Sequence, residues 1–247
     1  LNASILRDLL IPLPPTLAEQ RAIAEALSDA DALIEGLESL IAKKRAIKQG
    51  AMQELLTGKR RLPGFEAEWI NVRLHEIATA DWGNTTITKT SYRDHGFRAY
   101  SASGPDGLVD WCEHTSVGVV ISAIGAQCGK SWLTNDRWTP IKNTIWFKAH
   151  EGQSDTSFLH WLTSDREFWP KSGQAQPFVS VTGVRMALLH LPSSVDEQVA
   201  IAAVLSDMDA ELAALEARRE KTRALKQAMM QELLTGRTRL VGSAAAD

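Results

Sequence analysis

The feature that most constrains the fold of this chain is an internal repeat. Residues 13–62 align with residues 191–240 at a constant offset of 178, without a gap, and 28 of the 50 aligned positions are identical. A repeat determines the architecture of a chain, so it is considered before local secondary-structure signals. Only two copies are present, separated by residues of different composition. The sequence therefore predicts one globular domain between two equivalent arms, and not a solenoid.

Each arm is expected to form one long helix. Thr16 is a candidate N-cap, and Gly58 is a candidate C-cap followed by proline within five residues. The second arm has Ser194 as its candidate N-cap and Gly236 at its end. The position three residues after each cap, where a capping box needs an acidic or amide side chain, is a glutamate in both arms: Glu19 and Glu197.

Apolar residues recur along both arms at alternating spacings of three and four, which is the pattern of a coiled-coil seam. A single helix of this length cannot bury its own stripe, so the two arms are expected to pair as an antiparallel coiled coil. The fold class predicted is α+β, with a β-rich globular domain flanked by two long helices. The expected helix–helix contacts are Leu27, Ile34, Leu37 and Ile41 with Leu205, Met208, Leu212 and Leu215.

The middle of the chain reads as a compact domain with a β core. All eight tryptophans lie between Trp69 and Trp169. Strand-like runs occupy residues 97–100, 118–122, 131–133 and 144–147, with turn signals between them. Residues 155–168 are expected to form a short helix, with an apolar face made by Phe158, Leu159 and Leu162.

Bulk composition excludes several classes of protein. No apolar run approaches the roughly 18 residues of a membrane span, so no membrane partner is expected. Cys112 and Cys128 are the only cysteines, which argues against a disulfide framework and suits a reducing cytoplasm. The net charge is −3, although residues 84–148 contain seven Lys and Arg against five Asp and Glu.

Two segments resemble known binding motifs but lack the residue spacing that those motifs require. Residues 125–131 resemble a phosphate-binding loop, but three residues separate the glycines where four are required, and a β-hairpin is the better interpretation. Four side chains suggest a zinc site without the usual ligand spacing: Cys112, His114, Cys128 and His150. With no metal, cofactor or catalytic motif found, we expect a non-catalytic chain without a cofactor.

The arm motifs resemble the helical spacers of DNA specificity subunits of type I restriction–modification systems. These motifs are Leu13-Pro14-Pro15 followed by Glu19-Gln20, and the run from Lys48-Gln49 to Gly58. The resemblance extends into the middle domain at Glu68-Trp69 and at Tyr100-Ser101-Ala102-Ser103-Gly104. It implies a remnant of a preceding recognition domain at 1–12, spacers at 13–62 and 191–240, a target-recognition domain at 63–190 and a disordered tail at 241–247.

The resemblance also implies a role. The chain would be a non-catalytic reader of double-stranded DNA whose domain grips one half of a bipartite site in the major groove. Its helices would fix the distance between half-sites and dock the adenine methyltransferase subunits, and through them, indirectly, the restriction subunit.

Polar and basic residues on the expected loops of the domain are the candidates for DNA contact. Amide side chains read adenine, and lysines hold phosphates, so Gln174 and Gln176 are candidates for base contact and Lys130 and Lys142 for phosphate contact. Trp82 and Trp111 are the tryptophans worth testing for base stacking. The full set is Lys89, Tyr92, Arg93, Arg98, Ser101, Ser103, Gln127, Lys130, Lys142, Asn143, Lys171, Gln174 and Gln176.

One recognition domain reads one half-site, so we expect two copies to pair through their helices as a homodimer and to read a palindromic bipartite site. The alternatives are a coiled-coil adaptor whose middle domain binds protein and a truncated regulatory half-subunit. A DNA-modifying enzyme is disfavoured because no catalytic motif is found.

Overall fold

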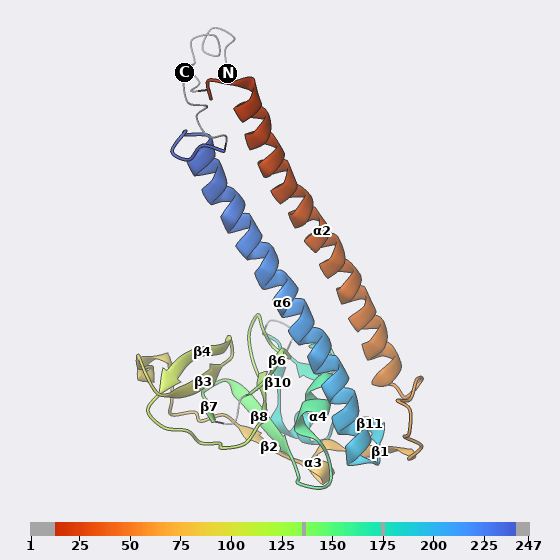
Figure 1. The fold of residues 1–247 in the computed structure, drawn as a ribbon. Helices are drawn as coiled ribbons and strands as arrows, with labels where there is room; N and C mark the ends of the chain where they lie inside the picture. Colours follow the sequence, from red (N-terminus) through yellow and green to blue (C-terminus); the bar gives the residue numbers. More distant parts are fainter. Residues whose placement is uncertain (1–12, 135–136, 174–175, 241–247) are drawn as a thin grey trace. The chain divides into compact units, whose positions relative to one another are not determined.

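The computed structural model describes residues 13–134, 137–173 and 176–240 (Figure 1). Two compact units make up the chain: Leu1–Lys48 with Met208–Asp247 form unit 1, and Gln49–Asp207 form unit 2. Helix α2 (Leu17–Leu55) and helix α6 (Val195–Leu233) run through both units. The predictions for residues 1–12, for Gln174 and for residues 241–247 lie outside the described residues.

The helix boundaries follow the local sequence signals. The hydroxyl of Thr16 accepts a hydrogen bond from the Glu19 backbone N–H at 3.2 Å, and the hydroxyl of Ser194 accepts one from Glu197 at 3.4 Å. Gly58 and Gly236 lie three residues after the last helical residues, Leu55 and Leu233, and have φ values of 68° and 72°. Glycine adopts this left-handed conformation without steric cost, so each glycine closes the turn that follows its helix, slightly beyond the helix end itself.

In unit 1, α2 and α6 lie side by side and antiparallel (Figure 1). Each expected seam residue is buried or half-buried, with Ile41 2% and Leu212 8% exposed. Leu205, also expected at the seam, is fully buried within unit 2. The α+β class with two long antiparallel helices is therefore confirmed. Within the described residues, neither these helices nor any other is long and apolar enough to cross a membrane.

Ion pairs between α2 and α6 in unit 1 follow the internal repeat of the sequence. Two sets are equivalent under the offset of 178: Lys48–Asp209 with Lys226–Asp31, and Arg45–Glu216 with Arg223–Glu38. An exposed pair adds little stability by itself. Four pairs along one seam, however, fix the register and the antiparallel direction of the helices. Identical polar residues in the two arms thus have a structural reason.

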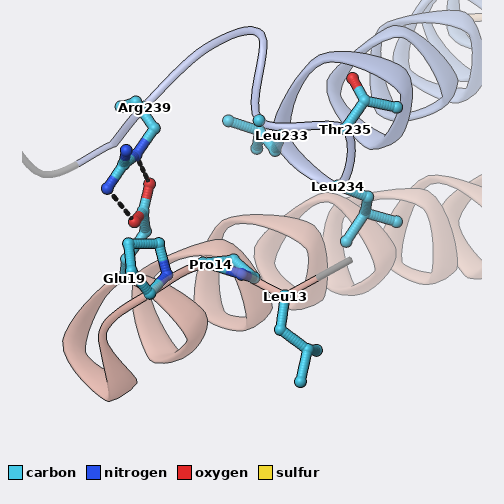
Figure 2. Close-up of a pocket in the computed structure, with 9 residues that line it drawn as sticks. Leu13, Pro14, Glu19, Leu233, Leu234, Thr235 and Arg239 are labelled. Atoms are coloured by element: carbon cyan, nitrogen blue, oxygen red, sulfur yellow. Dashed lines mark hydrogen bonds and ion pairs between the residues drawn. The ribbon is translucent and has the colours of Figure 1, made fainter. Parts of the chain in front are cut away.

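The capping-box interpretation of the two glutamates needs correction. Both carboxylates bind arginines instead: Glu197 accepts two bonds from Arg61, at 2.5 and 2.6 Å, and Glu19 accepts two from Arg239 (Figure 2). Both glutamates are almost fully buried. A buried carboxylate requires such a charged partner, and the hydrogen bond raises the pKa of each arginine.

Unit 2 contains eleven strands among its described residues, arranged in four small sheets. A four-stranded sheet has the order β2-β8-β5-β6, a three-stranded sheet the order β4-β3-β7, and two strand pairs join β1 to β11 and β9 to β10. The strands are β1 (Trp69–Arg73), β2 (Ala78–Trp82), β3 (Phe97–Ser101), β4 (Gly104–Val109), β5 (Val119–Ser122), β6 (Ser131–Leu133), β7 (Trp138–Pro140), β8 (Thr144–Ala149), β9 (Lys171–Ser172), β10 (Phe178–Val179) and β11 (Leu188–Pro192). The short helices are α3 (Leu74–Ile77), η1 (Lys89–Ser91), α4 (Thr156–Leu162) and α5 (Val181–Arg185).

The four predicted strands are present as β3, β5, β6 and β8, and β5 pairs with β6 as the expected β-hairpin. The predicted helix at 155–168 is shorter than expected and ends at Leu162. The Asp165 carboxylate accepts a hydrogen bond from the Glu167 backbone N–H at 2.8 Å, which forms a side-chain turn and breaks the helix. On the apolar face, Phe158 and Leu159 are fully buried and Leu162 is half-buried.

Candidate nucleic-acid interface

Five of the residues expected to contact DNA line one cavity of about 230 Å³ in unit 2. The sheet topology explains their convergence. β3 pairs antiparallel with β4 and parallel with β7, so the end of β3, the start of β4 and the end of β7 meet at one edge. The lining residues are Thr88, Lys89, Ser101, Ala102, Ser103, Ile141, Lys142 and Asn143.

A carboxylate beside this cavity organises its wall. Asp106 accepts hydrogen bonds from Lys89 Nζ at 2.5 Å, from the Tyr92 hydroxyl at 2.5 Å and from the Ser101 hydroxyl at 2.9 Å. Burial alone would raise the pKa of Asp106, but hydrogen bonds from Lys89, Tyr92 and Ser101 outweigh it and lower that pKa. Lys89 is thereby held in a fixed position with its charge partly neutralised.

Tyr92 contacts both the wall of the cavity, through Asp106, and a buried hydrophobic cluster. Its ring packs against the buried cluster of Ile87, Ala99, Val109 and Ile141. Burial first, and the bond to Asp106 second, raise the pKa of its hydroxyl. The phenol is therefore a neutral donor at physiological pH.

The opposite wall carries Lys142 and Asn143, both exposed. Asn143 is the one non-glycine residue with positive φ among those described, at 70°, and its carbonyl accepts a bond from Ala123 N at 3.0 Å. Asparagine tolerates this conformation better than most residues. Among the described residues, no ion pair involves Lys142, so its charge is available to an anion.

Two arginines of the candidate set lie in and just before β3 of the same sheet. Arg93 forms an ion pair with Asp110 at 3.3 Å and donates to backbone carbonyls at Ser91 and Tyr92. Arg98 is exposed on β3. Neither residue lines the cavity.

The remaining candidates form a second group on neighbouring segments. Gln127 and Lys130 lie on the β5–β6 turn, where Lys130 Nζ stands 5.4 Å from the ring centroid of Trp132. Lys171 on β9 pairs with Glu167 at 2.7 Å, while Gln176, before β10, is exposed. An antiparallel bridge between Ile124 and Phe178 joins the two segments.

The two tryptophans singled out for base stacking are the exposed ones, at 46% for Trp82 and 41% for Trp111. The other six are buried or half-buried. Three of the four side chains considered for zinc are engaged elsewhere: His114 stacks on Trp138, His150 bonds to Thr79, and the Cys128 thiol donates to the Ala123 carbonyl. Among the described residues, no group of three or more His, Cys, Asp and Glu could hold a metal ion.

The burial of His114 is expected to make the stability of unit 2 depend on pH. Burial, and secondly Lys148, lower its pKa from 6.5 to about 4. Below pH 6.5 the unfolded chain therefore binds a proton that the folded chain does not, so the free energy of unfolding should fall between pH 6.5 and 4. His114→Phe should remove part of this loss. Urea unfolding at several pH values would check it, with the exposed His95→Phe as control; equal pH profiles for both variants would contradict it.

Sequence analysis missed Asp106. This residue lies between the strand-like runs at 97–100 and 118–122, where turn signals were expected, and the structure places it in β4.

No family model matches the chain. Among solved structures, the S subunit of a type I restriction–modification system from M. genitalium superposes with a TM-score of 0.74 at 20% sequence identity, covering 94% of this chain and 65% of that one. This chain has an S-subunit fold. A second structure, from work on complex assembly and conformational transition of the type I R-M system, gives a TM-score of 0.56 at 18% identity and covers 95% of this chain and 63% of that one.

The S-subunit fold agrees with the resemblance found in the arm motifs. The chain spans slightly less than two thirds of the length of both S-subunit-like structures. Its two long helices and β-rich unit are the shared part, because 94% of its residues are covered by the first superposition.

Proposed function

We propose that this chain is the DNA specificity subunit of a type I restriction–modification system, and that it has no catalytic activity of its own. The observation that carries the proposal is the S-subunit fold over 94% of the chain. Residues 63–190 form the target-recognition domain in this proposal, and that domain reads one half of a bipartite site.

The chemistry of the cavity suits this role. Lysines bind phosphates, while amides and hydroxyls read base edges from a rigid scaffold. Lys142 supplies the charge, and Ser101, Ser103 and Asn143 supply neutral donors and acceptors. Gln127 and Gln176 offer amides on the neighbouring segments.

The helices act as a spacer. A helix of 39 residues is about 58 Å long at 1.5 Å per residue, and the paired seam with its ion pairs makes unit 1 stiff. Exposed faces of α2 and α6 dock the methyltransferase subunits, through which the restriction subunit joins. The assembly works in the cytoplasm.

A homodimer completes the bipartite reader. The seam is filled within one chain, so the second copy needs another surface. On α2, Leu33, Leu40 and Ile47 recur every seven residues and are 43%, 39% and 47% exposed. The equivalent residues of α6 are Glu211, Arg218 and Leu225. Two copies of α2 that pack antiparallel along this stripe bury it and relate two recognition domains by a two-fold axis.

Co-expression with the cognate methyltransferase subunit, followed by mapping of methylated adenines in the host genome, tests the function. We expect a bipartite palindrome that is absent when either subunit is expressed alone. An asymmetric motif would contradict the homodimer and keep the specificity role. A stable complex without methylation would favour a regulatory half-subunit or a protein adaptor.

A further inference from the structure

A second cavity in unit 2, of about 150 Å³, is bordered by two exposed aromatic side chains. Trp82, at the end of β2, and Phe178, at the start of β10, are 46% and 40% exposed. Large aromatic residues are mostly buried in folded proteins. Two exposed rings on one cavity therefore indicate a surface that contacts a ligand. The other lining residues are Ala123, Ile124, Asn143 and Val179.

The walls of this aromatic cavity are fixed by the backbone. Val179 N donates to the Ala123 carbonyl at 2.8 Å, and Ile124 bridges to Phe178. On the other side, Trp82 pairs with Ile145 in the antiparallel β2–β8 ladder, and the Trp146 side chain donates from Nε1 to the Trp82 carbonyl at 3.1 Å. A cavity held by main-chain bonds on both sides exists before any ligand binds, which lowers the ordering cost of binding.

The aromatic cavity adjoins the polar one. Asn143 lines both, and its neighbour Lys142 lines the polar cavity together with Lys89. The aromatic cavity, called the slot below, lies next to the polar cavity with its lysines. This arrangement matches the two halves of a nucleotide, because a base stacks on aromatic rings while lysine attracts its phosphate. A volume near 150 Å³ suffices for one six-membered ring, since an engineered protein cavity of that size binds benzene.

We propose that the two cavities together hold one nucleotide that has left the base stack of the DNA, with its base between Trp82 and Phe178 and its phosphate beside Lys142. The proposal rests on the proposed function, since it requires that the chain binds DNA. Bases inside a duplex cannot reach such a slot, so the nucleotide must be extruded, and an unpaired base is extruded at least cost. The slot thus favours DNA at positions that unstack easily, without reading a base edge.

The test compares two duplexes of about 20 base pairs with the same mixed sequence, one fully paired and one with a single bulged thymine at its centre. Affinity is measured with the full chain by fluorescence anisotropy. Wild type should bind the bulged duplex roughly tenfold more tightly, because stacking on aromatic side chains has about this effect per base. Trp82→Ala and Phe178→Ala should lose that preference, whereas Trp82→Phe should retain most of it.

Met186→Ala is the control, because Met186 lies in unit 2, is as exposed as Trp82 at 46%, and does not line the cavity. Its preference for the bulged duplex should equal that of wild type. Unchanged melting temperatures for all variants would confirm that the fold is intact.

Equal affinity of wild type for both duplexes would overturn the nucleotide slot and leave the proposed function standing. Binding of neither duplex would overturn both. A Trp82→Ala variant that keeps the preference but binds the methyltransferase subunit less tightly would assign the slot to a protein partner instead, and so overturn the proposal.

Discussion

Lys142→Ala is expected to weaken binding of duplex DNA roughly five- to tenfold near 0.1 M salt, and to lower the slope of log affinity against log salt by about 0.9. Lys142 is exposed on the wall of the polar cavity, and no ion pair among the described residues neutralises it. The loss should be similar for all DNA sequences, because a phosphate contact carries no sequence information.

Lys89→Ala provides the comparison. Lys89 lines the same cavity, but its ammonium group lies 2.5 Å from Asp106. Part of its charge is neutralised before DNA arrives, so the loss of affinity should be smaller than for Lys142. Asp106→Asn removes that neutralisation and should increase the affinity several-fold. This ordering of three variants in one cavity separates a specific phosphate contact from a general effect of net charge.

Anisotropy titrations at several salt concentrations would measure both the affinity and the slope. Lys221→Ala is the control, since Lys221 is exposed on α6 in unit 1, away from the cavity residues in sequence. Equal losses for Lys142 and Lys221 would contradict the assignment and leave only non-specific attraction to DNA.

Local signals explain why the helices and the hairpin could be predicted. The N-cap Thr16 and the glycine Gly58 affect only the helix residues a few positions away, so their signals can be recognised locally in the sequence. The apolar seam is equally recognisable, because its pattern repeats every seven residues. The β5–β6 hairpin was predictable for the same reason, because the glycines of its turn are adjacent to both strands.

The site was only partly predictable because it depends on pairing between distant segments. Ser101 and Lys142 are 41 residues apart in sequence and share a cavity because β3 pairs in parallel with β7. The partner of Glu197 is Arg61, 136 residues away. The repeat held a usable signal here, since Arg61 and Arg239 are identical at equivalent positions, as are Glu197 and Glu19.

The repeat also places two equivalent glutamines, Gln198 and Gln20, in different surroundings, so that their effects on the free energy of unfolding can be compared. Gln198 is fully buried in unit 2, where its Oε1 accepts bonds from the Ser154 hydroxyl at 2.7 Å and the Asp155 N–H at 2.9 Å. Its Nε2 donates to the Pro192 carbonyl at 2.9 Å. Gln198→Leu would leave these polar groups buried without partners, at a cost of about 3 kcal/mol in the free energy of unfolding.

Gln20 is the equivalent residue in unit 1 and has the same bond to the carbonyl of Pro14, at 3.0 Å. It is half-buried, so water can replace a lost bond. Gln20→Leu should therefore cost less than about 1 kcal/mol. Both substitutions remove the same side chain from the same local helix position and introduce the same leucine. Their difference isolates the bonds that Gln198 makes to the segment before α4.

Urea unfolding followed by tryptophan fluorescence would measure the first cost directly, because all eight tryptophans belong to unit 2. Far-ultraviolet circular dichroism would follow the helices and so report on Gln20→Leu in unit 1. Equal costs for the two variants would mean that the helix start alone determines the effect. A larger cost for Gln198→Leu than for Gln20→Leu would show that Gln198 holds the start of α6 against the segment before α4. Both glutamines bond to a proline carbonyl, but only Gln198 also bonds to Ser154 and Asp155.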